Sequence, residues 1–122
     1  MANPFVHIEL NTTDVDKSKA FYTALFDWEL GEMPMPGGTY YTIGVGKGGT
    51  GGGLTKQMIP GAPSSWVPYI EVADIKEATK KAKSLGAKVL LDSEAVAEMG
   101  WCSIFIDPSG TTTGLWKTKV VP

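Results

Sequence analysis

The only histidine of the chain, His7, stands two residues before a carboxylate, Glu9, in a segment of alternating character at residues 5–10. Side chains at i and i+2 of a β-strand point to the same face, so this spacing places the imidazole beside the carboxylate. A histidine held by a carboxylate is a common general acid–base arrangement, because imidazole changes its protonation near neutral pH. The same two groups also suit a pocket that binds a ligand without catalysing a reaction.

A second version of this segment occurs at residues 67–72, where Tyr69 and Glu71 take the places of His7 and Glu9. We therefore predict His7, Glu9 and Glu71 as candidate catalytic residues, and Tyr69 as a donor to a ligand oxygen. Two neighbouring carboxylates would suit a cationic or polyhydroxylated ligand better than an anionic one.

This correspondence continues along the chain as an internal repeat. The matched pairs, 60 to 62 positions apart, are residues 7–10 with 69–72, Asp14 with Asp74, Leu25 with Leu85, 42–43 with 103–104, and 53–56 with 114–117. Each half reads as strand, helix, strand, strand, strand. The pattern predicts an α+β fold of two βαβββ modules, whose sheets form a curved, mixed half-barrel with the helices outside and a cleft on the concave side.

The 122 residues fit one domain, with a first module at about 4–59, a linker at 60–65 and a second module at about 66–118. Thr13 is a plausible N-cap for a first helix at about 14–26, and Asp74 caps the second helix. Lysines on the second helix are expected to form a solvated face.

Residues 44–53 hold seven glycines, and their start matches the phosphate-binding pattern G-x-G-x-x-G. That motif must open a helix so that the phosphate meets the helix N-terminus. A strand-like segment follows here instead, so we interpret these residues as a hairpin loop.

The composition excludes several classes of partner. All eleven basic residues are lysine and the net charge is −2, which argues against nucleic acid and anionic membranes. The chain shows no signal peptide and no apolar run long enough to span a bilayer. Cys102 is the single cysteine, which suits a reducing cytoplasm, and its apolar surroundings predict a buried, inert thiol.

The duplicated βαβββ pattern resembles the vicinal oxygen chelate superfamily, which contains glyoxalase I, bleomycin-resistance proteins, fosfomycin-resistance enzymes and extradiol ring-cleaving dioxygenases. The resemblance covers essentially the whole chain. The segments that carry it are residues 7–9 with Asp14, 20–22, 25–28, 69–74, 85–87, 107–110 and 114–116.

In metal-using members, the resemblance implies ligands on the first and last strands of each module. The four positions here are His7, Gly53, Tyr69 and Gly114, of which only His7 is a usual ligand type. A catalytic zinc ion usually takes three protein ligands, and an iron triad takes two histidines and a carboxylate. We therefore expect no metal or other cofactor.

Alternation also predicts which residues line the cleft. If Ile104 and Ile106 join the helix-side core, the alternate residues of this strand face the cleft. These ligand-binding candidates are Trp101, Ser103 and Phe105. Trp116 lies two positions after Gly114 and should therefore also face the cleft. The two glycines, Gly53 and Gly114, would widen the cleft. Tyr41, Met58, Trp66 and Met99 are weaker candidates.

These observations predict a cytoplasmic protein that binds a small molecule in the concave cleft, without the usual metal ligands. It would sequester a toxic or antibiotic-like compound, as bleomycin-resistance relatives do, or carry out metal-free acid–base chemistry. The alternative is a metal-dependent lyase, isomerase or dioxygenase of the glyoxalase type that uses His7, Glu9 and Glu71. A homodimer is implied by the family resemblance alone.

Overall fold

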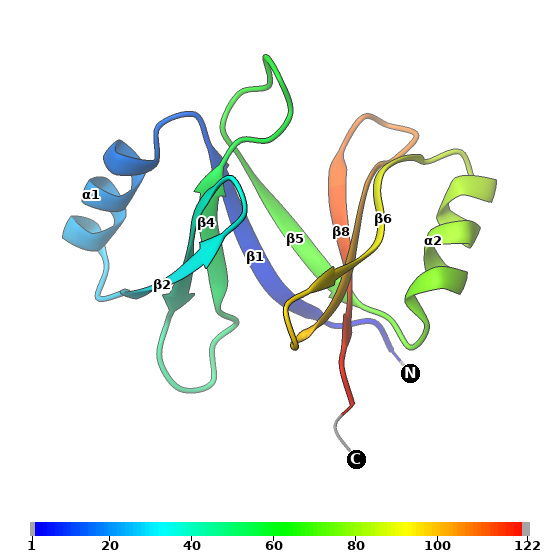
Figure 1. Ribbon diagram of the computed structural model, residues 1–122, viewed down its shortest axis with the longest axis horizontal. Helices are drawn as coiled ribbons and strands as arrows, with labels where there is room; N and C mark the ends of the chain where they lie inside the picture. Colours follow the sequence, from blue (N-terminus) through cyan, green and yellow to red (C-terminus); the bar gives the residue numbers. More distant parts are fainter. Residues whose placement is uncertain (1, 121–122) are drawn as a thin grey trace. The chain divides into compact units, whose positions relative to one another are not determined.

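The computed structural model describes residues 2–120, which form ten helices and strands (Figure 1). In chain order they are β1 (Phe5–Thr12), α1 (Val15–Leu25), β2 (Glu29–Met35), β3 (Gly38–Gly44), β4 (Gly52–Lys56), β5 (Ser65–Glu71), α2 (Ile75–Ser84), β6 (Lys88–Val96), β7 (Gly100–Ile106) and β8 (Thr112–Thr118). Each half therefore runs β-α-β-β-β, which confirms the α+β class and the two predicted modules.

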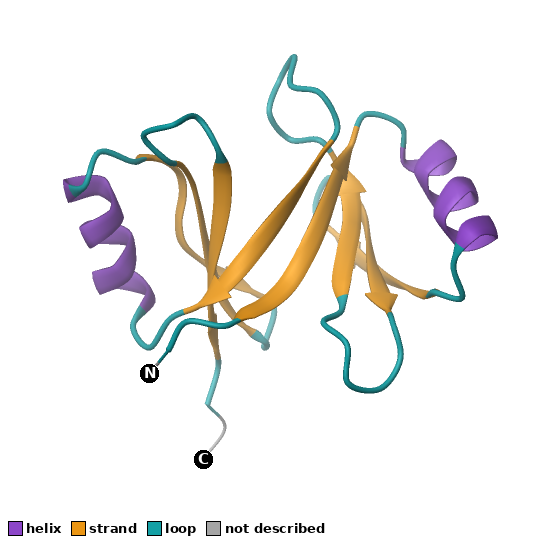
Figure 2. Ribbon diagram, turned by 180° about the vertical axis from the view of Figure 1, so that it is seen from behind, coloured by secondary structure: helices purple, strands orange, loops and turns teal. Residues whose placement is uncertain are grey.

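The chain divides into two compact units: an N-terminal unit of residues 7–67, and a C-terminal unit of residues 68–120 together with 2–6. In the N-terminal unit, β1 pairs in parallel with β4, and β4, β3 and β2 follow as antiparallel neighbours. In the C-terminal unit, β5, β8, β7 and β6 repeat this order. Figure 2 shows that each unit has a single helix beside its strands.

Each unit buries a small apolar core on the helix side of its sheet. The N-terminal core is Leu10, Ile43 and Leu54, which packs against Tyr22 of α1 among others. The C-terminal core consists of Val72, Ile75 and Leu115. Leu10 and Leu54 correspond in the repeat to Val72 and Leu115, whereas the third buried residue is Ile43 of β3 in one core and Ile75 of α2 in the other.

The two helices begin at equivalent aspartates. The Asp14 carboxylate accepts a hydrogen bond from the Lys17 amide at 3.0 Å, and the Asp74 carboxylate accepts one from the Glu77 amide at 3.1 Å. Such acceptors satisfy amide groups of the first turn that have no partner within the helix. The prediction of Thr13 as N-cap is wrong, because the Thr13 amide donates to Ser64 Oγ at 2.9 Å and the cap lies one residue later.

Two strands, β2 and β6, continue through residues that often interrupt a strand. β2 extends to Met35 because Pro34 lies on an edge strand, where a missing amide donor is tolerated, and Gly37 closes the hairpin with φ 87°. β6 continues to Val96 across a bulge at Ser93, whose φ is 50°. The Ser93 amide donates to Ser103 Oγ at 2.8 Å, which anchors the bulge.

The glycine-rich segment connects β3 to β4, so a strand follows it, as expected for a hairpin loop. Within residues 2–120, no helix has the length and apolar character needed to cross a membrane.

Candidate ligand site

The strand register of the N-terminal unit brings polar side chains from β1 and β3 to the sheet face opposite α1. Glu9 of β1 pairs with Gly53 of β4, and Gly53 pairs with Thr42 of β3. Paired residues share a face, and so do residues two apart along a strand. His7 and Tyr40 therefore lie on the same face as Glu9.

These three side chains form a hydrogen-bonded chain. The Tyr40 hydroxyl donates to Glu9 Oε2 at 2.9 Å, and the Tyr40 hydroxyl oxygen itself lies 2.6 Å from His7 Nε2. A phenol has one proton, and here it points to the carboxylate. Tyr40 Oη must then accept from His7, which places a proton on His7 Nε2.

Burial determines the charge of the His7 side chain in this hydrogen-bonded chain. Desolvation lowers the pKa of His7 from its ordinary value of 6.5, so the imidazole is neutral at pH 7. Glu9 is 8% exposed, and its Oε2 accepts the hydrogen bond from the phenol. A neutral imidazole, a phenol and the Glu9 carboxyl group, joined by hydrogen bonds, offer a route for proton movement.

Gly53 makes this arrangement possible. A Cβ atom at Gly53 would overlap the Tyr40 hydroxyl and would lie 2.6 Å from Cε1 of the ring. The tyrosine can therefore cross β4 and reach β1 only over a residue without a side chain. Position 53 is one of those at which the resemblance implies a metal ligand. This chain has Gly53 there, and the Tyr40 phenol lies above it.

The C-terminal unit uses the same device at the equivalent position. Tyr69 is 5% exposed, and its ring packs over Gly114, where an added Cβ would lie 2.8 Å from the ring Cγ. The two rings occupy the space above Gly53 and Gly114. The prediction that these glycines widen a cleft is therefore wrong within each unit, because each accommodates a tyrosine.

Tyr40 was missed from the sequence, where its neighbour Tyr41 was considered instead. Tyr41 packs against the helix-side core, with Lys19 Nζ 4.1 Å from its ring centroid. The alternation of β3 was enough to identify Tyr40. Ile43 is a core residue, and Tyr41, two positions away, lies on the same face as Ile43. Tyr40 must then face the other way.

The predicted orientation of β7 is also wrong. Trp101 and Phe105 pack against the core beneath α2, and the Ser103 hydroxyl lies 2.6 Å from Thr79 Oγ1 of that helix. The cause is a shift of one residue in the repeat: Thr42 pairs with Gly53, whereas Ile104 pairs with Gly114. A shift of one residue turns every side chain of a strand to the other face.

Two other predicted residues occupy the face opposite α2. Trp116 lies there with Gly114, as their shared parity indicated, and its ring nitrogen donates to Thr118 Oγ1 at 2.9 Å. Glu71 shares the parity of Tyr69, and its backbone amide donates to the Pro4 carbonyl at 3.0 Å. Because Glu71 belongs to the C-terminal unit, its pairing with His7 stays a prediction.

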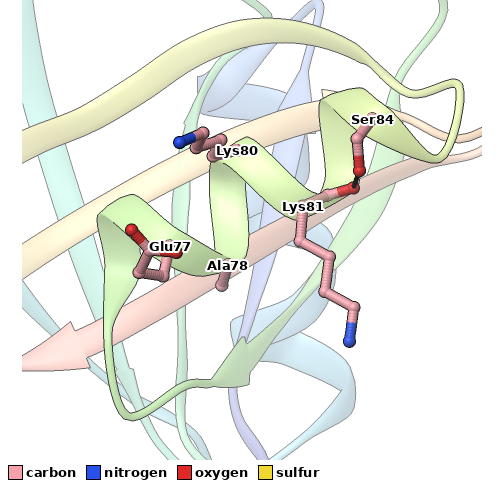
Figure 3. Close-up of a pocket in the computed structure, with 5 residues that line it drawn as sticks. All are labelled: Glu77, Ala78, Lys80, Lys81 and Ser84. Carbon is pink, nitrogen blue, oxygen red and sulfur yellow. Dashed lines mark hydrogen bonds between the residues drawn. The ribbon is translucent and has the colours of Figure 1, made fainter.

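A shallow hollow on α2 offers no comparable chemistry. Its lining residues are Glu77, Ala78, Lys80, Lys81 and Ser84, all from the one helix (Figure 3). The figure shows the lysine side chains extending away from the helix, and Ser84 Oγ donates to the Lys81 carbonyl at 2.7 Å. Polar groups do not converge there as they do around Tyr40.

The donor atoms present do not fit the metal that the resemblance implies for other members. Glycine at positions 53 and 114 supplies no side-chain ligand, and the neighbouring tyrosines fill both places. Across the described residues 2–120, no three side chains from histidine, cysteine, aspartate and glutamate gather as a metal-binding group. A catalytic metal normally needs about three such ligands.

The chain is similar to known proteins in sequence and in fold. Residues 4–44 match the family model of the bleomycin resistance protein-like N-terminal region. CFP32 of Mycobacterium tuberculosis, whose name marks it as a candidate glyoxylase, is 32% identical over 116 residues, which cover 92% of this chain and 44% of CFP32. A solved methylmalonyl-CoA epimerase from M. tuberculosis has a TM-score of 0.71 at 12% identity, over 95% of this chain and 88% of that one.

The chain belongs to the vicinal oxygen chelate superfamily. Its relatives in the superfamily include DnrV of Streptomyces peucetius, an anthracycline biosynthesis protein that is 26% identical over 127 residues, 93% of this chain and 46% of DnrV. The chain spans less than half the length of these curated relatives. The match to the epimerase shows that the superfamily fold extends over almost the entire chain.

Proposed function

We propose that this superfamily member binds a flat, neutral or cationic small molecule, and that the His7–Tyr40–Glu9 chain is its metal-independent polar anchor. The observation that carries the proposal is the Tyr40 hydroxyl, which bridges the imidazole and the carboxylate above Gly53. In this arrangement the Tyr40 ring occupies the space that a metal-ligating side chain at position 53 would need.

The charge of the sheet face supports this ligand class. Strand register places a second carboxylate, Glu29, on the same face as Glu9 and Tyr40. Residues 7–67 are all described, and their strands carry one lysine, Lys56. Lys56 lies two positions after the core residue Leu54 on β4, so its side chain is on the helix side of the sheet. With two acidic groups and no basic one from the strands, the face disfavours anions such as an acyl-CoA.

Anthracyclines fit the same requirements, since they are flat hydroxylated quinones that carry an amino sugar. The name of DnrV connects that relative with anthracycline biosynthesis. Half-buried Met33, which pairs with Tyr40 across β2 and β3, adds an apolar, adaptable surface beside the polar anchor. We therefore choose daunorubicin as the probe and coenzyme A as the anionic comparison.

Fluorescence titration with daunorubicin tests the proposal. We expect saturable binding by the wild-type chain and a roughly tenfold weaker Kd for Tyr40→Phe, since one hydrogen bond in a buried site is worth about 1.4 kcal/mol. Tyr41→Phe is the matched control, because Tyr41 lies on the helix side, and it should leave Kd unchanged. Tighter binding of coenzyme A than of daunorubicin, or no effect of Tyr40→Phe, would contradict the proposal.

Acid–base catalysis is a second candidate, favoured by the continuous path from His7 through Tyr40 to Glu9. Mass spectrometry of the recovered probe separates it from sequestration. An unchanged compound after incubation favours binding alone. A product that forms with the wild-type chain and not with Tyr40→Phe favours catalysis.

A further inference from the structure

An open hollow lies between helix α2 and the bulge of β6, with charged and polar side chains from both elements around it. We call it the α2–β6 hollow; its volume is about 510 Å³, and its lining residues are Lys76, Lys80, Lys83, Asp92 and Ser93. A volume of this size falls in the range of small-molecule sites. The hollow drawn in Figure 3 lies beside it and shares Lys80 with it.

The three lysines of the α2–β6 hollow form one stripe along the helix. Lys76, Lys80 and Lys83 are spaced i, i+4 and i+7, which places their side chains on one helix face. Like charges at this spacing repel one another. Within the described residues 2–120, none of these ammonium groups forms an ion pair with a carboxylate. The stripe therefore presents positive charge that is available to an anionic ligand.

The fourth lysine of α2 lies outside this hollow. Lys81 follows Glu77 at the i+4 position, and both residues line the neighbouring hollow. Figure 3 shows the side chains of Lys80 and Lys81 leaving the helix in different directions. Lys81 thus offers a matched comparison, because it carries the same charge on the same helix.

The fold does not require the lysine stripe, as the internal repeat shows. At the offset of 60 that relates the two helices, α1 has Asp16, Ala20 and Thr23 in place of the three lysines. The chain has a net charge of −2, yet four of its eleven lysines lie on the ten residues of α2. Positive charge is therefore concentrated at a place where the fold accepts other residue types.

The opposite wall of the hollow is held in place by the bulge of β6. The Ser93 backbone has a φ of 50°, and its amide donates to Ser103 Oγ at 2.8 Å. The Ser93 hydroxyl donates to Asp92 Oδ1 at 2.8 Å. A hydroxyl group rotates to suit its partner, so this one can donate to a ligand oxygen instead. The wall thus adds a donor and a carboxylate acceptor to the three ammonium groups.

We propose that the α2–β6 hollow binds a small molecule with a polyphosphate group, such as a nucleoside triphosphate. Lysine ammonium groups bind phosphate as point charges, and three of them on one stripe favour a ligand with several phosphates. The Asp92 carboxylate is the acceptor for sugar hydroxyl groups of the same ligand. The hollow belongs to the C-terminal unit, so this inference does not depend on the ligand proposed for the His7–Tyr40–Glu9 chain.

Isothermal titration calorimetry of the full chain with ATP, in magnesium-free buffer of low ionic strength, tests the inference. We expect saturable binding of ATP and clearly weaker binding of AMP, which has a single phosphate. Lys76→Gln and Lys83→Gln should each weaken the Kd for ATP roughly fivefold, a modest factor because solvent screens exposed lysines. Asp92→Asn should strengthen binding, because it removes the negative charge from the hollow.

Lys81→Gln is the matched control and should leave the Kd for ATP unchanged, and far-UV circular dichroism confirms that each variant is folded. Tripolyphosphate separates the two sources of the phosphate group. A Kd equal to that of ATP assigns recognition to the phosphates alone, whereas tighter binding of ATP adds a contact with the nucleoside. Absence of saturable ATP binding, equal affinity for AMP, or a Lys81→Gln effect as large as that of Lys83→Gln would overturn the inference.

Discussion

Replacement of Gly52 by alanine should lower the free energy of unfolding by about 3 kcal/mol or more, the upper range for overpacked sites. An added Cβ would overlap the Ile8 carbonyl oxygen and lie 3.0 Å from the carbonyl carbon. Both atoms belong to the backbone of β1, which pairs in parallel with β4 at this point. No side-chain rotation relieves such a contact, so the two strands must separate.

Urea unfolding followed by far-UV circular dichroism measures this effect. Gly44→Ala is the control, because its added Cβ would meet its nearest neighbour, the Glu29 carbonyl oxygen, at an ordinary 3.5 Å. We expect that variant to stay within about 1 kcal/mol of wild type. Equal stability of Gly52→Ala and Gly44→Ala would show that β1 and β4 are not packed as described. The site would be affected as well, because His7 and Glu9 flank Ile8.

Gly53→Ala should disrupt the site more than the fold. Here the added Cβ meets the far end of the Tyr40 side chain, which can swing away. The movement would break the two buried hydrogen bonds of Tyr40 to His7 and Glu9, at a cost of about 1–3 kcal/mol. Binding of daunorubicin should weaken by at least tenfold, as for Tyr40→Phe.

A double-mutant cycle tests whether Tyr40 carries this effect. In a Tyr40→Ala background, Gly53→Ala should cause little further loss of stability, because the ring that it displaces is already absent. Urea unfolding of the four proteins gives the coupling free energy. Additive losses would mean that Gly53 acts through some other contact.

The sequence predicted the modules well because their signals are local. Asp74 caps the second helix as predicted, and Leu10 and Leu54 follow the alternation of a half-buried sheet. Such patterns depend on residues near one another in the chain. The same local logic correctly identified His7 and Glu9 as neighbours on one face.

The errors arose where strands pair across long distances. Ser103 was assigned to the wrong face because β7 is displaced by one position in the repeat relative to β3. The repeat alone did not reveal a shift of a single residue. Tyr40 was missed for a related reason: its partners, His7 and Glu9, are more than thirty residues away, and only the side-chain-free Gly53 lets it reach them.

We propose that Tyr40 links His7 to Glu9 in a hydrogen-bonded chain that needs no metal ion to bind its ligand. Because His7 is the only histidine, nitrogen-15 NMR of its ring gives one unambiguous set of signals. We expect the neutral Nε2–H tautomer at pH 7 and a protonation midpoint below 6.5, since burial lowers the pKa of His7. The stability that follows from this lowered pKa is present above pH 6.5 and is lost as the pH falls toward the folded-state value.

Addition of Zn²⁺ to the same sample completes the measurement. We expect the His7 ring signals to stay unchanged at one equivalent of metal, and to shift in Tyr40→Phe even without metal. An Nδ1–H tautomer, a midpoint at or above 6.5, or a stoichiometric Zn²⁺-induced shift of the His7 nitrogens would contradict the account.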